Sequence, residues 1–322
     1  MEMIYANENR EDLGVLSSFK LDMAFGYDEN NFELKTSINN NLCSKGYIIY
    51  AEDKEYGGII DSMKVDTKEK SITYSGRTWH GVLDSKVISP DLGHDYYTIS
   101  GDANNVLDSL IDRMGLNSLF KSISEPSGIT ITNYSFDRYT TGYTGIRKML
   151  AKHGAKLIMK YVDFHVLLYA MPIVDYSNNE EFDSDLVDFR IQEKYNPINH
   201  VICLGKGELK DRQIVHVYCD SKGNLSPVQI LEGTDEVCAI YDNVNAENIE
   251  ELKKGGIDKI SESRNNNLIE IIFNGDSEYD IGDIIGAREN ITRIFAYAPI
   301  TKKIVKIEEG KPIMLSYSVS EK

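Results

Sequence analysis

The 322-residue sequence predicts a β-rich α+β protein with two small β-barrel domains, an α+β domain between them and a helical insertion. Short apolar runs separated by polar turns fill residues 13 to 77 and return at the C-terminal end, as in small barrels. From about residue 87 to 188, apolar residues recur with helical spacing instead. We therefore expect a first β-barrel domain at 1–86, the α+β domain at 87–188, a second β-barrel domain at 189–235 and 265–322, and the helical insertion at 236–264.

The first predicted barrel contains about five strands that are rich in Ile, Val, Tyr and Phe, the residues that favour pleated structure. The expected strands are Leu13–Phe25, Phe32–Ile38, Tyr47–Ala51, Gly58–Thr67 and Ser71–Ser75. Gly57 and Gly58 predict a bulge or a sharp corner where a barrel strand bends. We group Gly76 with them as a structural turn position.

Arg77, Trp79 and His80 lie close together after this barrel and raise the question of a catalytic or binding site. An arginine could hold an anion, a histidine could move a proton, and the only tryptophan could stack on a sugar. However, no acidic partner or nucleophile stands at a fixed local spacing, and Trp and His are often buried. The sequence favours a structural role, in which Trp79 anchors a short helix, Thr78 to Asp84, onto the barrel.

Two amphipathic helices are expected in the α+β domain. The first follows Asp102, a typical N-cap residue, and ends at Gly115, which suits the position after a helix. Its apolar face would be formed by Val106, Leu107, Leu110, Ile111 and Met114. The second covers about Thr144 to His153 and is stopped by the glycine that follows. A paired β-ribbon, Lys156–Met159 with His165–Ala170, is expected after it.

The stretch from Asn199 to Asp220 contains two apolar runs that predict buried strands of the second barrel. Gly205 and Gly207 supply the positive φ or close approach that the turn between them needs, and Arg212 belongs to the same structural element. A phosphate-binding G-x-G-x-x-G loop is disfavoured because Lys210 occupies the third glycine position and a strand follows in place of a helix. We expect these strands to pair with the alternating strand at 313–319 and its neighbours.

One helix, capped by Asn245, is expected in the insertion. The acidic run that follows the next strand raises a calcium hypothesis. An EF-hand loop would need glycine where Ile281 stands and glutamate where Ala287 stands, and a helix should follow it. Gly282 and Asp283 are instead predicted to turn the chain into a strand, so we expect no metal site there.

The composition restricts the classes of function. Lys and Arg number 35 and Asp and Glu number 51, which gives a net charge of −16 and disfavours specific nucleic-acid binding. The first residues carry acids where a signal peptide needs positive charge, and no apolar run approaches the roughly 18 residues of a membrane span. We expect synthesis in the cytoplasm, no membrane insertion and no cofactor. The widely spaced cysteines predict free thiols; they are Cys43, Cys203, Cys219 and Cys238.

The order of five sequence segments resembles a known family. One of them is NHVICLGKGEL at Asn199–Leu209, which is followed by Arg212 and IVHVY. The others are EYGGIID at Glu55–Asp61, YSGRTWHGVL at Tyr74–Leu83, ISGDANNVLDSLI at Ile99–Ile111 and YDIGDIIGA at Tyr279–Ala287. Together they are similar to the Gp37-like tail proteins of siphoviruses and the XkdQ (YqbQ) type of PBSX-like prophage tails. The resemblance spans nearly the whole chain.

The resemblance implies a non-enzymatic baseplate hub in a phage, a prophage tail or a tail-like bacteriocin, and thus in a virion or phage-tail-like particle. The hub family is similar to that of contractile injection systems, in which two related barrels per chain in a homotrimer match a sixfold tail tube to a threefold spike. The implied partners are further copies of this chain, the tail tube protein, the spike protein and other baseplate proteins. A tail-associated cell-wall hydrolase or glycan-binding tail-tip protein is the alternative, although neither G-x-S-x-G nor H-E-x-x-H occurs.

Overall fold

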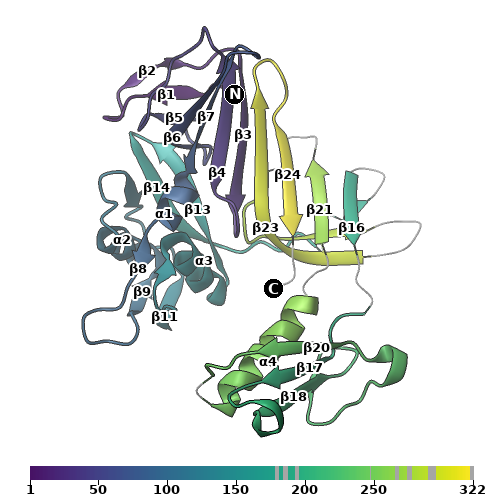
Figure 1. The fold of residues 1–322 in the computed structure, drawn as a ribbon. Helices are drawn as coiled ribbons and strands as arrows, with labels where there is room; N and C mark the ends of the chain where they lie inside the picture. The colour runs from purple at the N-terminus through teal and green to yellow at the C-terminus, as the bar shows by residue number, and fades with distance from the viewer. Residues whose placement is uncertain are drawn as a thin grey trace. The chain divides into compact units, whose positions relative to one another are not determined.

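The computed structural model describes residues 1–177, 181–183, 188–192, 196–246, 248–264, 268–273, 278–288 and 295–319. The chain forms two compact units (Figure 1). Unit 1 comprises Met1–Phe189 and Glu270–Val319, and unit 2 is built from Arg190–Ile269. Within the described ranges, no helix has both the length and the apolar character that a membrane crossing requires.

The largest sheet combines N-terminal and C-terminal strands, as Figure 1 shows for β3 and β23. Its order is β16-β21-β24-β23-β3-β4-β7-β6-β5-β1-β2, with β22 on β23 and β15 on β22. The strands are β1 Ile4–Ala6, β2 Asp12–Val15, β3 Phe19–Gly26, β4 Asn31–Ser37, β5 Ile48–Tyr50, β6 Gly57–Asp66, β7 Ser71–Thr78, β15 Glu181–Asp183, β16 Asp188–Gln192, β21 Leu268–Phe273, β22 Ile284–Arg288, β23 Phe295–Glu308 and β24 Met314–Val319. The order has open ends, so the described strands form no closed barrel.

The position of the C-terminal strands differs from the predicted second barrel. β23 pairs antiparallel with β3, from Lys302 opposite Gly26 to Glu308 opposite Lys20. The stretch Asn199–Asp220, which we expected beside these strands, lies in unit 2. Alternating side chains define the two faces of a strand but not its neighbour, so the sequence pattern could not choose between these partners.

The predicted N-terminal strands are all present, with one division. The run Leu13–Phe25 is divided into β2 and β3 near Ser18, whose φ of 51° breaks the extended conformation. β3 and β4 alternate strictly for most of their length, with apolar side chains buried and charged side chains exposed. One face of the sheet therefore belongs to the core, and the other carries a charged surface.

An α+β part of unit 1 follows β7 along the chain. Its elements are α1 Trp79–Asp84, β8 Val87–Ile88, β9 Thr98–Asp102, α2 Ala103–Arg113, β10 Phe120–Ser122, β11 Thr130–Ser135, β12 Thr140–Thr141, α3 Gly142–Lys152, β13 Ala155–Val162 and β14 His165–Pro172. The predicted N-cap is confirmed, because the Asp102 carboxylate accepts a hydrogen bond from Asn104 N at 3.0 Å. β13 and β14 form the predicted ribbon.

Trp79 lies in the core that joins this α+β part to the large sheet. Its side chain is fully buried, and its ring stacks on Tyr161 of β13 with 5.5 Å between centroids. The same cluster contains Ile48 and Tyr50 of β5 together with apolar residues of α2 and α3. α1 thus begins on the inside of the molecule, which supports the anchoring role predicted for Trp79.

Unit 2 is a small α/β unit and not a barrel with a helical insertion. Its strands are β17 His200–Leu204, β18 Ile214–Cys219, β19 Leu225–Ser226 and β20 Cys238–Asp242, in the order β19-β18-β17-β20. Its helices are η1 Leu209–Asp211, η2 Gly233–Asp235 and α4 Ile249–Arg264. α4 packs on Val201, Cys203 and Val217 through Leu252 and Ile260. β20, which falls inside the predicted insertion, pairs parallel with β17.

α4 is a continuous helix, and its cap differs from the predicted one. The Asn248 side chain, not Asn245, accepts the hydrogen bond from Glu251 N at 2.9 Å. The glycines at the middle of the helix permit close packing: a Cβ on Gly256 would lie 2.4 Å from Cys203 Sγ. Tight contact with the sheet offsets the low helix propensity of these glycines.

Candidate assembly groove and buried lysine clusters

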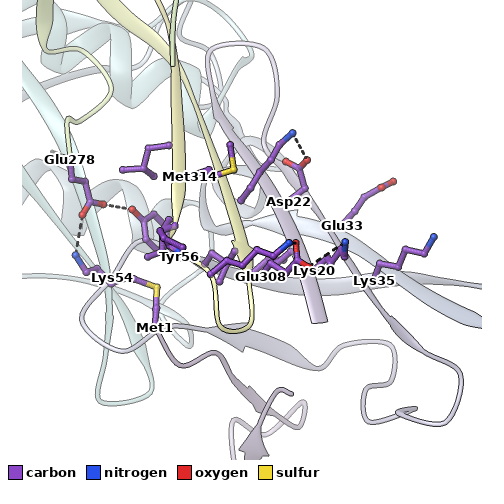
Figure 2. Close-up of a pocket in the computed structure, with 17 residues that line it drawn as sticks. Met1, Lys20, Asp22, Glu33, Lys35, Lys54, Tyr56, Glu278, Glu308 and Met314 are labelled. Atoms are coloured by element: carbon purple, nitrogen blue, oxygen red, sulfur yellow. Dashed lines mark hydrogen bonds and ion pairs between the residues drawn. The ribbon is translucent and has the colours of Figure 1, made fainter. Parts of the chain in front are cut away.

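A groove of about 840 Å³ lies in unit 1 beside the β23–β24 hairpin (Figure 2). Its lining comes from segments that are distant in the sequence: the N-terminus, β3, β4, Lys54 and Tyr56, Glu278 and the hairpin. Figure 2 shows Lys54, Tyr56 and Glu278 on one side of the view and Glu33 and Lys35 on the other. The groove therefore depends on the pairing of β23 with β3.

Charged side chains from neighbouring strands meet along this groove. Lys306 lies opposite Asp22 in the register, with Nζ 3.4 Å from the carboxylate, and Lys20 lies opposite Glu308 at the same distance. The Lys306, Asp22 and Lys20 side chains are more than half exposed. Exposed pairs of this kind contribute only about 0–1 kcal/mol each, so they can exchange partners at little cost.

Glu278, which lines the groove, also binds a fully buried lysine. Lys303 of β23 donates to Glu278 Oε1 at 2.9 Å and to Glu55 Oε1 at 2.6 Å, and its side chain is 0% exposed. Tyr56 Oη donates to the same oxygen of Glu278, and Lys54 Nζ lies 3.0 Å from the other. These bonds fasten the C-terminal strand β23 to the turn before β6.

Lys303 and Glu278 hold each other in the charged state, whereas burial raises the pKa of Glu55. Burial alone would lower the pKa of Lys303, but the Glu55 carboxylate and its neighbours hold the pKa well above 10.5. Burial would likewise raise the pKa of Glu278. The cation of Lys303 and the hydrogen bonds from Tyr56, Lys303 and Lys54 outweigh this effect and lower the pKa to about 2.

A second buried lysine binds the acidic run that we considered for calcium. Lys156 of β13 donates to Asp280 Oδ2 at 2.7 Å and to Asp283 Oδ2 at 2.6 Å. Asp283 also accepts a hydrogen bond from Val174 N at 2.9 Å, and Gly282 makes the turn with a φ of 99°. Burial would lower the pKa of Lys156, but the hydrogen bonds to the two aspartates raise it. The ammonium group of Lys156 thus supplies the positive charge that a calcium ion would bring to these two aspartates.

Arg77, Trp79 and His80 have separate surroundings. The Arg77 guanidinium makes two hydrogen bonds of 2.8 Å to the Asp61 carboxylate at the surface. His80 is 3% exposed and stacks on Phe25, with ring centroids 4.8 Å apart. Burial, with the nearby cation of Lys303, lowers the pKa of His80 to about 3, which keeps its ring neutral.

The predicted glycines of the first domain gather around Trp79 and the β6–β7 pair. A Cβ on Gly57 would lie 2.6 Å from the Trp79 ring. On Gly58 it would lie 2.2 Å from Arg77 O, and on Gly76 it would lie 1.9 Å from a carbonyl oxygen of β6. At these three positions a neighbouring chain segment approaches the glycine so closely that no room is left for a Cβ atom. The predicted bulge itself lies farther along β6, between residues 60 and 62.

The predicted residues of the β17–β18 turn also lie together. Gly207 has a φ of 96°, and a Cβ on Gly205 would lie 2.7 Å from the side chain of Gln213. The Arg212 side chain donates to Gly205 O at 3.2 Å and to Asp242 Oδ1 at 2.5 Å. The arginine therefore ties the turn to the end of β20.

The two lysine clusters were not predicted from the sequence. Lys303 shares its strand face with Val305 and Ile307, which are buried, so its place in the alternation could have indicated a buried charge. Its acidic partners are 248 and 25 residues away, and no local spacing connects them. The same holds for Lys156 and Asp283, which are 127 residues apart.

No protein-family model and no curated protein matches the chain. Solved structures do match it. The 43 kDa tail protein of prophage MuSo2 from Shewanella oneidensis has a TM-score of 0.58 at 12% identity, covering 100% of this chain and 98% of that chain. The tail protein from Neisseria meningitidis MC58 has a TM-score of 0.54 at 12% identity, and the match covers 99% of this chain and 96% of that chain. A chain of the phage P2 baseplate in its activated conformation has a TM-score of 0.50 at 12% identity, and the match covers 99% of this chain and 98% of that chain.

The chain has the fold of phage tail and baseplate proteins. This similarity extends over almost the full length of both partners in each comparison. The tail-protein fold thus includes both units of the chain, and the groove lies within unit 1 of it.

Proposed function

We propose that the chain is a structural hub protein of a baseplate, of the Gp37-like or XkdQ type. It would join the tail tube to the central spike in a phage, a prophage tail or a phage-tail-like particle. The observation that carries this proposal is the similarity to tail and baseplate proteins over nearly the whole of both chains. Because the match extends over nearly the whole of both chains, it compares the complete architecture and not a single domain that occurs in many unrelated proteins.

In this proposal three copies form a ring by cyclic symmetry, and neighbouring baseplate proteins contact its faces. The groove beside the β23–β24 hairpin is the surface that we assign to such a contact. Its exposed charges of both signs can form new ion pairs with a partner, and its volume of about 840 Å³ can accept a protruding segment. The net charge of −16 suits a ring through which DNA passes without binding.

The proposal includes no catalytic activity. His80 is buried and neutral, so it has no access to a substrate in solution. The carboxylates of Glu55, Glu278 and Asp283 are bound to lysines. Neither the His80 ring nor these three carboxylates are available for the acid–base chemistry that a cell-wall hydrolase requires.

An in-frame deletion of the gene in the strain that produces the particle tests this role. Electron microscopy should show tubes without baseplates, and complementation should restore the complete particle. The purified chain should leave no clear zone in a peptidoglycan zymogram. Complete baseplates in the deletion strain, or a clear zone with the purified chain, would favour the hydrolase or glycan-binding alternative.

A further inference from the structure

The face of the unit 2 sheet opposite α4 carries a cluster of metal-ligand side chains. His200 of β17 lies directly opposite Cys238 of β20 in the parallel register, so the two side chains point to the same face. Glu236 precedes Cys238 by two residues on the same side of the chain. The ligand atoms of His200, Glu236 and Cys238 lie within 4.8 Å of one another. Figure 1 shows β17 between β18 and β20.

The backbone around this cluster is fixed by one residue, Asn199. Its side-chain amide donates to Asp235 O at 2.8 Å, and its Oδ1 accepts from Val237 N at 3.1 Å. Its own backbone N–H donates to Val237 O at 3.0 Å. These three bonds bracket Glu236, so the distance between Glu236 and His200 does not depend on a flexible loop.

His200 is held at both ring nitrogens. Nδ1 lies 2.6 Å from Glu236 Oε1, and Nε2 lies 2.8 Å from Nδ1 of His216 on β18. The Tyr218 ring packs on His200 with 4.5 Å between centroids. A histidine that binds a metal through one nitrogen commonly donates its other N–H to a neighbouring acceptor, which fixes its tautomer and orientation. His216 is placed to be that acceptor.

We propose that His200 Nδ1, Glu236 and the Cys238 thiolate form a zinc site in unit 2, with His216 as the residue that positions His200. Nitrogen and sulfur donors select a borderline-soft ion over Mg²⁺ or Ca²⁺. Tetrahedral bonds of about 2.0–2.3 Å place ligand atoms about 3.3–3.8 Å apart. The ion replaces the proton between His200 Nδ1 and Glu236 Oε1, which separate from 2.6 Å to about 3.3 Å, and Cys238 moves inward by about 1 Å. Water takes the fourth position.

The site has an entry path and a structural consequence. Cys238 is exposed, so the ion reaches the site from solvent. Bound zinc would link β20 to β17 at the point where the chain returns from the long connection 220–237. The expected result is a more stable unit 2, because an ion that binds only the folded state stabilises it by mass action. This inference is independent of the assembly role proposed above.

Cobalt substitution of the untagged full-length chain tests the site. One Co²⁺ per chain should bind with a thiolate charge-transfer band, and excess Zn²⁺ should abolish the band. Cys238→Ser should remove the band, and Glu236→Gln should weaken binding at least tenfold. His216→Asn should weaken it about 10–100-fold, as is usual for a positioning residue. His94→Asn, at an exposed histidine between acidic residues of unit 1, is the matched control and should change nothing.

Thiol reactivity gives a second test that needs no variant. Cys238 is the only exposed cysteine, and the other three are buried. A thiol reagent should therefore modify it first, Zn²⁺ should slow that reaction at least tenfold, and a chelator should restore the rate. Reaction at the same rate with and without Zn²⁺, or metal binding that persists unchanged in Cys238→Ser, would overturn the proposal.

Discussion

Lys303 Nζ lies 2.6 Å from Glu55 Oε1, although the two residues are 248 positions apart in the chain. Lys303 is the fully buried charge of β23, and Glu55 lies in the turn before β6. A lysine in such a position must be paired, because an isolated buried charge costs several kcal/mol. This pair therefore specifies how the C-terminal strands dock on the N-terminal half of unit 1.

Replacement of Lys303 by Met should strongly destabilise unit 1. The substitution leaves the Glu55 carboxylate without its cation and leaves Glu278 with Lys54 alone, and removing one partner of a buried pair costs about 3–5 kcal/mol. Denaturant unfolding followed by the fluorescence of Trp79, the only tryptophan, measures this in unit 1 alone. Lys306→Met, on the same strand with a side chain 57% exposed, should stay within about 0.5 kcal/mol of wild type. Equal losses for both variants would contradict the role of the buried pair.

The stability of unit 1 should fall in acid partly through Glu278. Its pKa is about 2 in the folded chain against an ordinary 4.5, so the folded state binds fewer protons than the unfolded state between these values. The stabilisation is complete above pH 4.5 and is lost as the pH falls toward 2. Glu278→Gln should be less stable at neutral pH and should lose less on acidification. Parallel curves of melting temperature against pH for the two proteins would rule this out.

Gly57→Ala should disturb the packing of Trp79. The added methyl group would lie 2.6 Å from the indole ring and 2.7 Å from Ile49 O. Overpacking of this kind costs about 1–3 kcal/mol, and the tryptophan emission should shift because the ring must move. Gly93→Ala is the control: no atom lies within 4 Å of its new methyl group, although its φ is positive. It should cost about 1–2 kcal/mol through its positive φ and leave the emission unchanged, because the indole ring keeps its place.

Charge reversal in the groove should impair assembly without unfolding the chain. Lys306→Glu places two acids opposite each other at Asp22, on a surface where a single pair contributes at most about 1 kcal/mol. Circular dichroism and melting temperature should stay close to wild type, while incorporation into particles should fall. Lys121→Glu, on the exposed side of β10, changes the net charge equally and should be incorporated normally. Normal incorporation of the Lys306 variant would exclude the groove as a contact surface.

The local elements could be predicted from the sequence because their signals are local. Asp102 and Gly115 mark the ends of α2, and the glycine turn at 308–311 separates β23 from β24. Strand alternation in β3, β4 and β24 gives the buried face correctly. These features depend on residues within one or two turns of each other, where spacing and structure are directly linked.

The long-range arrangement could not be predicted in the same way. Nothing in the pattern of β23 distinguishes β3 from β17 as its neighbour, and the contact between Lys156 and Asp283 is visible only after folding. His200 and Glu236 are 36 residues apart, so their cluster has no recognisable ligand spacing. The family resemblance indicated a tail protein, but it did not give the separate unit 2 or the open order of the large sheet.

A reconstruction of the intact native particle, with this chain located in the density, tests the hub role most directly. The account predicts three copies in a ring where the tail tube meets the central spike, with the groove beside the β23–β24 hairpin occupied by a neighbouring baseplate protein. Six copies per ring, or a location on the tail fibres, would contradict it.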